Sequence, residues 1–403
     1  MKKIISCFIA IVLICIVGFS IYKKNNPQSE IEKRLNNSNV YPYYQSLSTE
    51  DKEIYVNICT AIETFDYAMD FGKFDTYKEA REMKNKAVEI YSALIYEQPQ
   101  YFWIDPYGCR YSIVEEKGNK FTFYATGILS PKEAKEKKEI FDKKVSEIVS
   151  EAKAKADAYS QILYVHDEIL NNTSYDYELS KEINKSNQNI FTAYLSDDEP
   201  QHTTDIKQTA YGCLIDGKTV CSGYSLAFNL IMQELGYECG AVRNKALSTS
   251  ITFLGDGHVS NYCKIDNEYY YFDLTWDDVD DSGYYKQYFD YTYENFAITK
   301  QEFTKRHLIE ENVYAPDGQS LKYDYYVKNK MYFEKYDFES VKESILSQSS
   351  KNYVVLKFGD YSETLKAQTE LLENRKILSL IGEKELTYVI PEFSTFLYIF
   401  FKN

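Results

Sequence analysis

The chain has 403 residues, which is too many for one ordinary hydrophobic core, so its length predicts two or three domains. The hydrophobic fraction of 44% and the aromatic fraction of 16% are enough to build buried cores, which excludes a disordered protein. The net charge of −15, without a basic stripe interleaved with aromatic residues, excludes nucleic acid as an expected partner.

The N-terminal segment, residues 1–24, is predicted to be a membrane anchor or a signal peptide. Two lysines precede an uncharged, mostly apolar run from Ile4 to Tyr22, and two more lysines follow it. As a helix, a run of this length nearly spans the bilayer core. The alternatives are a secretory signal cleaved after a small-residue site near Gly18–Ser20 and a lipoprotein modified at Cys15. All three place the rest of the chain outside the cytoplasm.

A helix-rich N-terminal domain is predicted over residues 41–158, after a polar linker over 25–40. From Leu47 to Pro99 apolar residues recur at spacings of three and four, which indicates helix. Two short strands are expected next, at Arg110–Val114 and Phe121–Ala125.

One long helix is predicted to lead into the middle of the chain. It begins at Ser130-Pro131, a typical helix start, and reaches about Leu170 because few helix breakers intervene.

Cys221 is predicted to lie at the beginning of a helix. The segment Gly217–Ser225 precedes an apolar stripe at helical spacing, and Gly236 provides the stop. At a helix N-terminus the unpaired backbone N–H groups and the dipole stabilise a thiolate. The same groups can stabilise the oxyanion that forms when a thiolate attacks a carbonyl. A buried structural cysteine is the alternative interpretation.

A β-hairpin is predicted to supply the partner base. The runs His258–Ile265 and Glu268–Thr275 flank Asp266-Asn267, a favourable two-residue turn. Pairing Ile265 with Glu268 places His258 and Asp273 on one face as diagonal neighbours, within reach of a hydrogen bond. Asp273 would then fix the tautomer of His258, and His258 would take the proton of Cys221.

Cysteine and histidine usage predicts neither a metal site nor a cofactor. The chain has no C-x-x-C pair and only four histidines, and Cys221 leaves an odd number of other cysteines beyond the first segment. We therefore expect buried cysteines rather than a disulfide framework. His166 is expected to be structural, and His202 and His307 are expected to be surface residues.

An acidic stretch resembles the start of a calcium loop. It reads Asp278-x-Asp280-x-Ser282-Gly283, but Phe289 occupies the twelfth position, where a bidentate glutamate belongs. A solvated acidic loop is the better interpretation.

The C-terminal region, residues 320–403, is predicted to be a small α+β domain because strands and helices alternate. The predicted strands are Tyr325–Phe333, Tyr353–Phe358, Glu385–Ile390 and Thr395–Phe401, and the predicted helices are Phe338–Leu346 and Ser362–Leu372.

Three stretches follow one another in the middle of the chain: Cys221-Ser222-Gly223-Tyr224-Ser225, Gly257-His258-Val259-Ser260-Asn261 and Tyr270-Tyr271-Phe272-Asp273-Leu274-Thr275-Trp276. In these motifs and their order the chain resembles the transglutaminase-like superfamily. The resemblance implies an α+β fold with a papain-like transglutaminase core over residues 159–315. It also implies Cys221 as nucleophile, His258 as general base and acid, and Asp273 as the residue that orients His258.

The chain departs from the family at one position. Where the family often has Trp two residues after the histidine, this sequence has Ser260, so an aromatic wall near the site is expected to be lost. Ser222 and Tyr224 are secondary candidates for substrate binding or oxyanion stabilisation, and Tyr224 could equally pack the start of the helix.

The sequence therefore predicts an extracytoplasmic thiol enzyme that acts on amide or peptide carbonyls, with protein or peptide substrates that include cell-wall peptide. The thioester would pass to water, as in a protease or amidase, or to an amine, as in cross-linking, and the residues do not decide between these acceptors. The alternative from another class is a non-catalytic cell-surface or cell-wall binding module that retains the fold.

Overall fold

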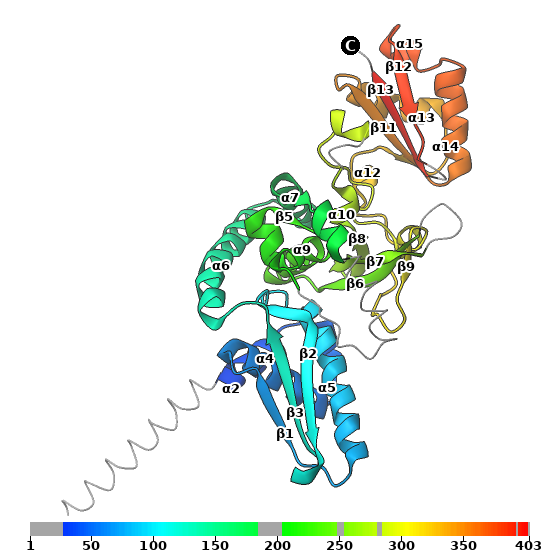
Figure 1. The fold of residues 1–403 in the computed structure, drawn as a ribbon. Helices are drawn as coiled ribbons and strands as arrows, with labels where there is room; N and C mark the ends of the chain where they lie inside the picture. Colours follow the sequence, from blue (N-terminus) through cyan, green and yellow to red (C-terminus); the bar gives the residue numbers. More distant parts are fainter. Residues whose placement is uncertain (1–26, 184–203, 248–253, 280–283, 392–393, 402–403) are drawn as a thin grey trace, which may run out of the picture. The chain divides into compact units, whose positions relative to one another are not determined.

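The computed structural model describes residues 27–183, 204–247, 254–279, 284–391 and 394–401. The chain divides into two compact units. Unit 1 runs to Ala156 and includes Ser160–Ala241, whereas unit 2 consists of Asp157–Tyr159 and Val242–Asn403. The division after Ala241 falls inside the region 159–315 that was predicted as one domain. The mixture of helices and sheets confirms the α+β class (Figure 1).

The apolar run Ile4–Tyr22, expected to be an anchor or signal, lies outside the described residues. Among the helices that the structure does describe, none is both long enough and apolar enough to cross a membrane.

The first described element of unit 1 is a helix where a polar linker was expected. Helix α2 (Pro27–Asn36) buries Ile31 and Leu35, which lie one turn apart on the same face and pack toward α4 (Thr49–Thr64). The prediction of a linker over 25–40 is therefore wrong from Pro27 onward, because two apolar residues at this spacing are enough to dock a short helix.

A three-stranded antiparallel sheet with helices packed against it follows. Its strands are β1 (Ala68–Gly72), β2 (Ile104–Val114) and β3 (Lys120–Gly127), in the order β1-β3-β2. Helices α4 and α5 (Tyr77–Glu97) contact this sheet (Figure 1). Strands β2 and β3 confirm the two predicted runs, and β1 interrupts the region that was expected to be helical throughout.

The long helix predicted from Ser130 is divided in two. Helix α6 (Pro131–Lys153) has the expected start, since Ser130 and Glu133 form a capping box, and α7 (Ala158–Asn172) follows after a short break. The break coincides with the point where the chain first passes between the units. The other α-helices and strands described in unit 1 are α3 (Pro42–Ser46), β4 (Ser174–Tyr175), β5 (Lys218–Thr219) and α9 (Cys221–Glu234).

Unit 2 holds most of the sheet that carries the hairpin, in the strand order β8-β7-β6-β9, and the division between the units falls within strand β6. The strands of this sheet are β6 (Cys239–Leu247), β7 (Leu254–Ile265), β8 (Glu268–Phe272) and β9 (His307–Ile309), and the short helices α10 (Leu274–Asp277) and α11 (Lys300–Phe303) lie between β8 and β9 in the sequence.

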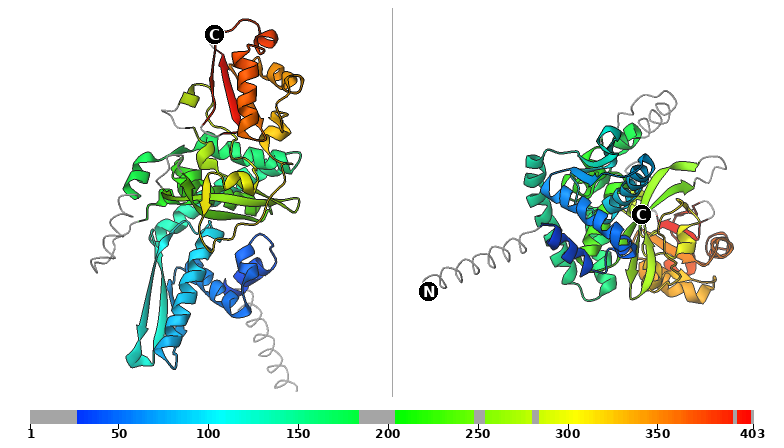
Figure 2. Two further views of the ribbon diagram at one scale, coloured as in Figure 1. Left: turned by 90° about the vertical axis from the view of Figure 1, so that its right-hand side faces the viewer. Right: turned by 90° about the horizontal axis from the view of Figure 1, so that it is seen from below.

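The C-terminal part of unit 2 contains a second four-stranded sheet, with helices α13 and α14 beside it (Figures 1 and 2). The strand order is β10-β11-β13-β12. Strand β13 is buried along its whole length because it is central and covered on both faces. The elements are α12 (Tyr325–Lys328), β10 (Tyr332–Phe333), α13 (Phe338–Gln348), β11 (Tyr353–Phe358), α14 (Tyr361–Gln368), α15 (Leu378–Ile381), β12 (Leu386–Val389) and β13 (Phe396–Phe401).

The prediction is wrong in one C-terminal element and confirmed in the others. Tyr325–Phe333 was expected to be one strand, but it forms α12 followed by the short β10. The cause is local, because the Asp324 side chain accepts hydrogen bonds from the backbone N–H groups of Tyr326 and Val327 and so starts a helix.

Candidate active site

Cys221 is the first residue of α9 and is partly exposed, as the sequence predicted. The preceding loop packs tightly against this helix start, because a Cβ at Gly223 would overlap the Thr219 hydroxyl and lie 2.9 Å from the Thr209 carbonyl oxygen. Glycine is therefore required two residues after Cys221. The first N–H groups of a helix have no acceptor within it, so Cys221 sits where an anion is stabilised.

The two secondary candidates on α9 point into unit 1. The hydroxyl of Ser222 donates a hydrogen bond to the Gln208 carbonyl oxygen at 2.8 Å, and the Tyr224 side chain is fully buried. Both side chains thus help to fix the helix start, and their suggested roles toward substrate stay predictions.

The hairpin that carries His258 has the predicted register. Ile265 pairs with Glu268 and Asn261 with Phe272, and both turn residues, Asp266 and Asn267, have the positive φ of a type I′ turn. Strand β8 ends at Phe272, three residues before the predicted end at Thr275. Asp273 therefore caps α10, where Thr275 was expected to continue the strand.

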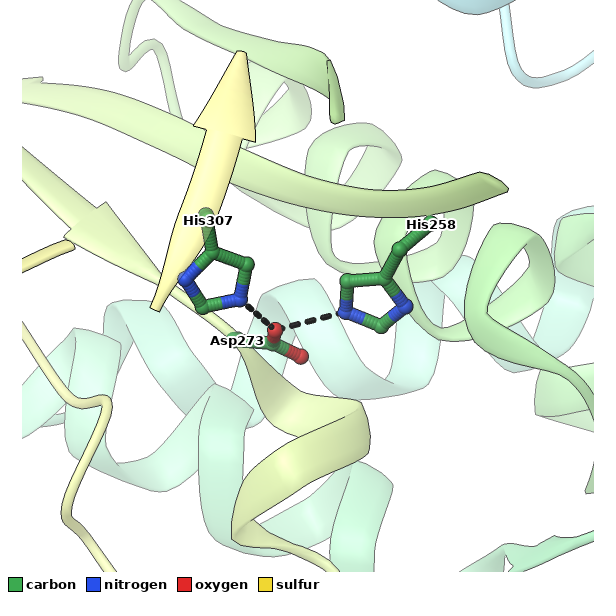
Figure 3. Close-up of side chains that lie close together, drawn as sticks. All are labelled: His258, Asp273 and His307. Atoms are coloured by element: carbon green, nitrogen blue, oxygen red, sulfur yellow. Dashed lines mark hydrogen bonds and ion pairs between the residues drawn. The ribbon is translucent and has the colours of Figure 1, made fainter. Parts of the chain in front are cut away.

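The predicted hydrogen bond between the hairpin strands is present. His258 Nε2 lies 2.7 Å from Asp273 Oδ2, and both side chains are buried (Figure 3). Asp273 Oδ1 accepts the Trp276 backbone N–H at 3.1 Å, which holds the carboxylate at the helix start. The other ring nitrogen of His258, Nδ1, points away from Asp273 (Figure 3).

Ser260, the departure from the family pattern, contacts the same carboxylate. Its hydroxyl donates to Asp273 Oδ2 at 3.1 Å, and Asn244 Nδ2 lies 3.2 Å from the hydroxyl oxygen. Because the amide N–H donates to that oxygen, the hydroxyl proton is directed at Asp273. Ser260 is therefore part of the network that orients Asp273.

Trp276 provides an aromatic neighbour that was expected to be missing. Its ring stacks beside the imidazole of His258, with the ring centroids 5.5 Å apart and the planes inclined by 27°. The expectation that Ser260 leaves the site without an aromatic wall is therefore wrong.

His307 is the residue that the sequence interpretation missed. It was expected to be a surface residue, but it is 1% exposed and its Nε2 lies 2.9 Å from Asp273 Oδ2 (Figure 3). The contact arises because β9 pairs antiparallel with β6, with His307 opposite Ala246. No local sequence pattern predicts this pairing of β9 with β6.

The electrostatics of the site favour an ionised Asp273. Burial alone would raise the pKa of its carboxyl group, but the charges and hydrogen bonds of His258 and His307 outweigh burial and hold the pKa well below its usual range. Asp273 is thus a carboxylate over the whole range of ordinary pH.

His166 and most of the described cysteines lie in buried surroundings. His166 is fully buried in α7, with Nδ1 3.0 Å from Asp167 Oδ1, and His202 lies outside the described residues. The six described cysteines are free thiols, and four of them are buried. Of the calcium-like stretch, Asp280 to Gly283 also lie outside the described residues.

Within the described part of the chain, His258, Asp273 and His307 are the side chains that lie close enough to hold a metal ion together. Their potential ligand atoms all lie within 4.8 Å of one another. Hydrogen bonds through Asp273 Oδ2 account for this closeness. These three residues belong to unit 2, whereas Cys221 belongs to unit 1.

Comparison with known proteins gives a match over the middle of the chain. Residues 143–303 match the family described as transglutaminase-like domain. None of the curated proteins matches the chain.

Two solved structures are also similar. One is described as a candidate cysteine protease from Cytophaga hutchinsonii, at 12% identity and a TM-score of 0.24, covering 42% of this chain and 61% of that one. The other is described as a TGase, at 12% identity and a TM-score of 0.27, covering 54% of this chain and 53% of that one. The chain therefore spans less than two thirds of the length of either structure.

Proposed function

The chain carries a transglutaminase-like domain at residues 143–303, and from that premise we propose that it is a thiol enzyme acting on amide or peptide carbonyls, with Cys221 as nucleophile. The observation that carries this proposal is the buried 2.7 Å hydrogen bond between His258 Nε2 and Asp273 Oδ2. An imidazole held by a carboxylate on one nitrogen is the usual partner of a catalytic thiol or hydroxyl.

The proton transfers follow from the tautomer that Asp273 selects. Because Asp273 accepts the proton on Nε2, the neutral His258 ring has its lone pair on Nδ1, where it can take the thiol proton of Cys221. The imidazolium so formed is stabilised by the ionised carboxylate.

The reaction would proceed in two steps, formation and then breakdown of an acyl-thioester. The Cys221 sulfur attacks the carbonyl carbon, the C–N bond breaks, and His258 returns its proton to the departing amine, which leaves an acyl-thioester. Water or a second amine, deprotonated by His258, then attacks the thioester and releases the thiol. Backbone N–H groups in the first turn of α9 are suited to stabilise the oxyanion in both steps.

We also propose that this chemistry takes place outside the cytoplasm. The support is the apolar run Ile4–Tyr22 between paired lysines, which would anchor the chain or direct its export. The substrate would then be a surface protein or a cell-wall peptide. Protease treatment of intact cells should degrade the domain, and a domain that stays protected until the cells are lysed would contradict the placement.

The test of the enzyme proposal is the reactivity of Cys221. The full chain in detergent is treated with iodoacetamide at a series of pH values from 5 to 9, and mass spectrometry locates the label. We expect rapid labelling of Cys221 at pH 6, about 100-fold faster than an ordinary thiol, because an ion pair keeps the sulfur as thiolate.

Two variants make this test specific. His258→Ala should slow the labelling of Cys221 at pH 6 to the rate of an ordinary thiol, and Cys221→Ala should abolish that label without changing the others. Labelling of Cys221 at an ordinary rate in the unmodified chain would contradict the enzyme and favour the alternative, a non-catalytic surface or cell-wall binding module.

A further inference from the structure

Both ring nitrogens of His307 face oxygen atoms. Nδ1 lies 3.0 Å from the carbonyl oxygen of Phe303, at the end of α11, and Nε2 lies 2.9 Å from Asp273 Oδ2. The side chain is 1% exposed, so water does not replace either contact. The protonation of this ring therefore follows from what its two partners can accept and donate.

The two hydrogen-bond partners determine which protonation state of the His307 ring fits this site. A backbone carbonyl oxygen only accepts hydrogen bonds, so Nδ1 of His307 carries a proton. A neutral ring would then turn the lone pair of Nε2 toward Asp273 Oδ2. Asp273 Oδ2 already accepts the Ser260 hydroxyl and faces His258 Nε2, and Oδ1 accepts the Trp276 N–H, so this carboxyl group is surrounded by donors and acts as an acceptor. Both contacts are favourable hydrogen bonds only if Nε2 of His307 carries a proton as well as Nδ1.

We propose that His307 is a buried imidazolium that acts as a positioning residue, holding Asp273 ionised and aimed at His258. The protonation state stands on the geometry of unit 2 alone, whereas the positioning role rests on the proposed function. His307 touches neither the reacting sulfur nor the substrate carbonyl in this proposal, and acts only through Asp273.

The surroundings of His307 are suited to a cation. The Phe303 ring lies parallel to the imidazole, 4.1 Å away and inclined by only 2°, and the Trp276 ring lies 4.2 Å away. Aromatic faces attract a cation, most strongly where water is excluded. Two aromatic rings and one carboxylate thus offset the cost of burying the charge.

The charged groups around His307 come from several elements. Asp273 approaches from the start of α10 and His258 from β7, with its ring centroid 5.7 Å away. Arg306, next to His307 in the sequence, lies over the Trp276 ring at 4.4 Å and pairs with Glu294 at 3.4 Å. Asp273 is the anion in direct contact, so it is the counter-ion of His307.

This arrangement has a consequence for His258. A carboxylate paired with an imidazolium is close to neutral overall, so it stabilises the protonated form of His258 less than a lone carboxylate would. Replacing His307 by a neutral donor should therefore move the pH at which His258 loses its proton upward, by about one pH unit.

The first experiment reads the protonation state directly. Magic-angle-spinning NMR of the full chain labelled with ¹⁵N-histidine separates protonated from bare ring nitrogens, and the chain has only four histidines to assign. We expect both nitrogens of His307 to be protonated from pH 6 to pH 8. A bare nitrogen on His307 at pH 7, whether from a neutral ring or from a bound metal ion, would overturn the proposal.

The second experiment tests the positioning role. In His307→Gln the titration midpoint of His258, measured by the same NMR signals, should rise by about one pH unit. The matched control is His166→Gln, which removes a buried histidine beside a carboxylate in unit 1 and should leave that midpoint unchanged. An unmoved midpoint in folded His307→Gln would overturn the positioning role.

If His307→Gln fails to fold, His307→Phe is used, because it keeps the ring stack with Phe303 and Trp276 and removes both donors.

Slow labelling of Cys221 in the unmodified chain would contradict the enzyme proposal. The NMR result for His307 does not depend on that labelling, so the two failures are distinguishable.

Discussion

The two units each bury a carboxylate, and the two carboxylates behave in opposite ways. In unit 1, Glu97 is 6% exposed and accepts hydrogen bonds from the backbone N–H groups of Tyr43 and Tyr44 and from the Tyr55 hydroxyl. Burial raises the pKa of Glu97 to about 7, because these hydrogen bonds lower it by less than burial raises it. In unit 2, Asp273 is 1% exposed, and its pKa lies well below the usual range.

The difference shows that the charge of the donors decides the outcome more than their number. Glu97 has three neutral donors, whereas two of the four donors of Asp273 are imidazoles that can carry a positive charge. Neutral donors satisfy the geometry of a buried carboxylate, but a cation is needed to keep it ionised at low dielectric. Unit 1 therefore carries a carboxylate with the properties of an acid, and unit 2 one with the properties of a permanent anion.

The largest expected effect comes from replacing each carboxylate by its amide. Asp273→Asn should lower the free energy of unfolding of unit 2 by about 4 kcal/mol, because it leaves buried imidazoles without their counter-ion. Glu97→Gln should change that of unit 1 by no more than about 1 kcal/mol at pH 8, since it also removes an uncompensated charge. Urea unfolding at pH 8 measures both.

The two tryptophans of the chain allow this measurement in each unit separately. Trp103 is buried in unit 1 and Trp276 lies in unit 2, so Trp276→Phe leaves a reporter for unit 1 and Trp103→Phe leaves one for unit 2. Equal losses in Asp273→Asn and Glu97→Gln would show that the comparison between the carboxylates is false.

The next effect is the pH dependence of unit 1. The pKa of Glu97 is about 7 in the folded chain, against an ordinary value of 4.5. Between these values the folded state binds more protons than the unfolded state, so stability falls as pH rises from 4.5 through 7. The stability of unit 1 should be about 2–3 kcal/mol higher at pH 5 than at pH 8 on account of Glu97.

Glu97→Gln is the control, because it should remove this part of the pH dependence. The ionisation of Asp273 should add no pH dependence to the stability of unit 2 between pH 5 and pH 8. Its folded pKa is depressed, so its contribution to stability is present above the ordinary value of 3.8 and is lost only as pH falls further. A unit 1 whose pH dependence is the same with and without Glu97 would contradict the raised pKa.

The smallest effect tests a neutral donor beside the cationic ones. Ser260→Ala removes the hydroxyl that donates to Asp273 and should cost unit 2 about 1 kcal/mol, while Cys221 stays rapidly labelled. Ser320→Ala is the control for Ser260→Ala, because it also removes one serine hydroxyl from a hydrogen bond in unit 2, the one that Tyr270 donates to Ser320. A cost for Ser260→Ala equal to that of Asp273→Asn would mean that neutral donors matter as much as charge.

The contrast between the two histidines of the site explains how far the sequence could predict it. The Asp266-Asn267 turn fixes the hairpin register within a few residues, so the neighbourhood of His258 and Asp273 followed from local rules. His307 arrives through the pairing of β9 with β6, whose residues lie about 60 positions apart, and no turn or periodicity specifies that pairing. Tertiary contacts alone reveal it.

The same limit applies to the fold. The strand β11 and the helices α4, α9 and α13 followed from periodicity, because long apolar patterns dominate there. The break between α6 and α7 did not, since Ala154–Asp157 contains no helix breaker and the interruption coincides with the passage between units. The side-chain cap at Asp324 likewise starts a helix at Tyr325, where a strand was predicted.

The order of the units along the chain has a consequence for biosynthesis. A ribosome makes all of unit 1, including Cys221, before it makes His258, Asp273 and finally His307. At ordinary elongation rates several seconds separate the thiol from the last of these residues. On the proposed function, the nascent protein therefore holds its nucleophile as an ordinary thiol throughout this interval. Its reactivity toward neighbouring proteins would begin only when the hairpin and β9 have emerged and folded.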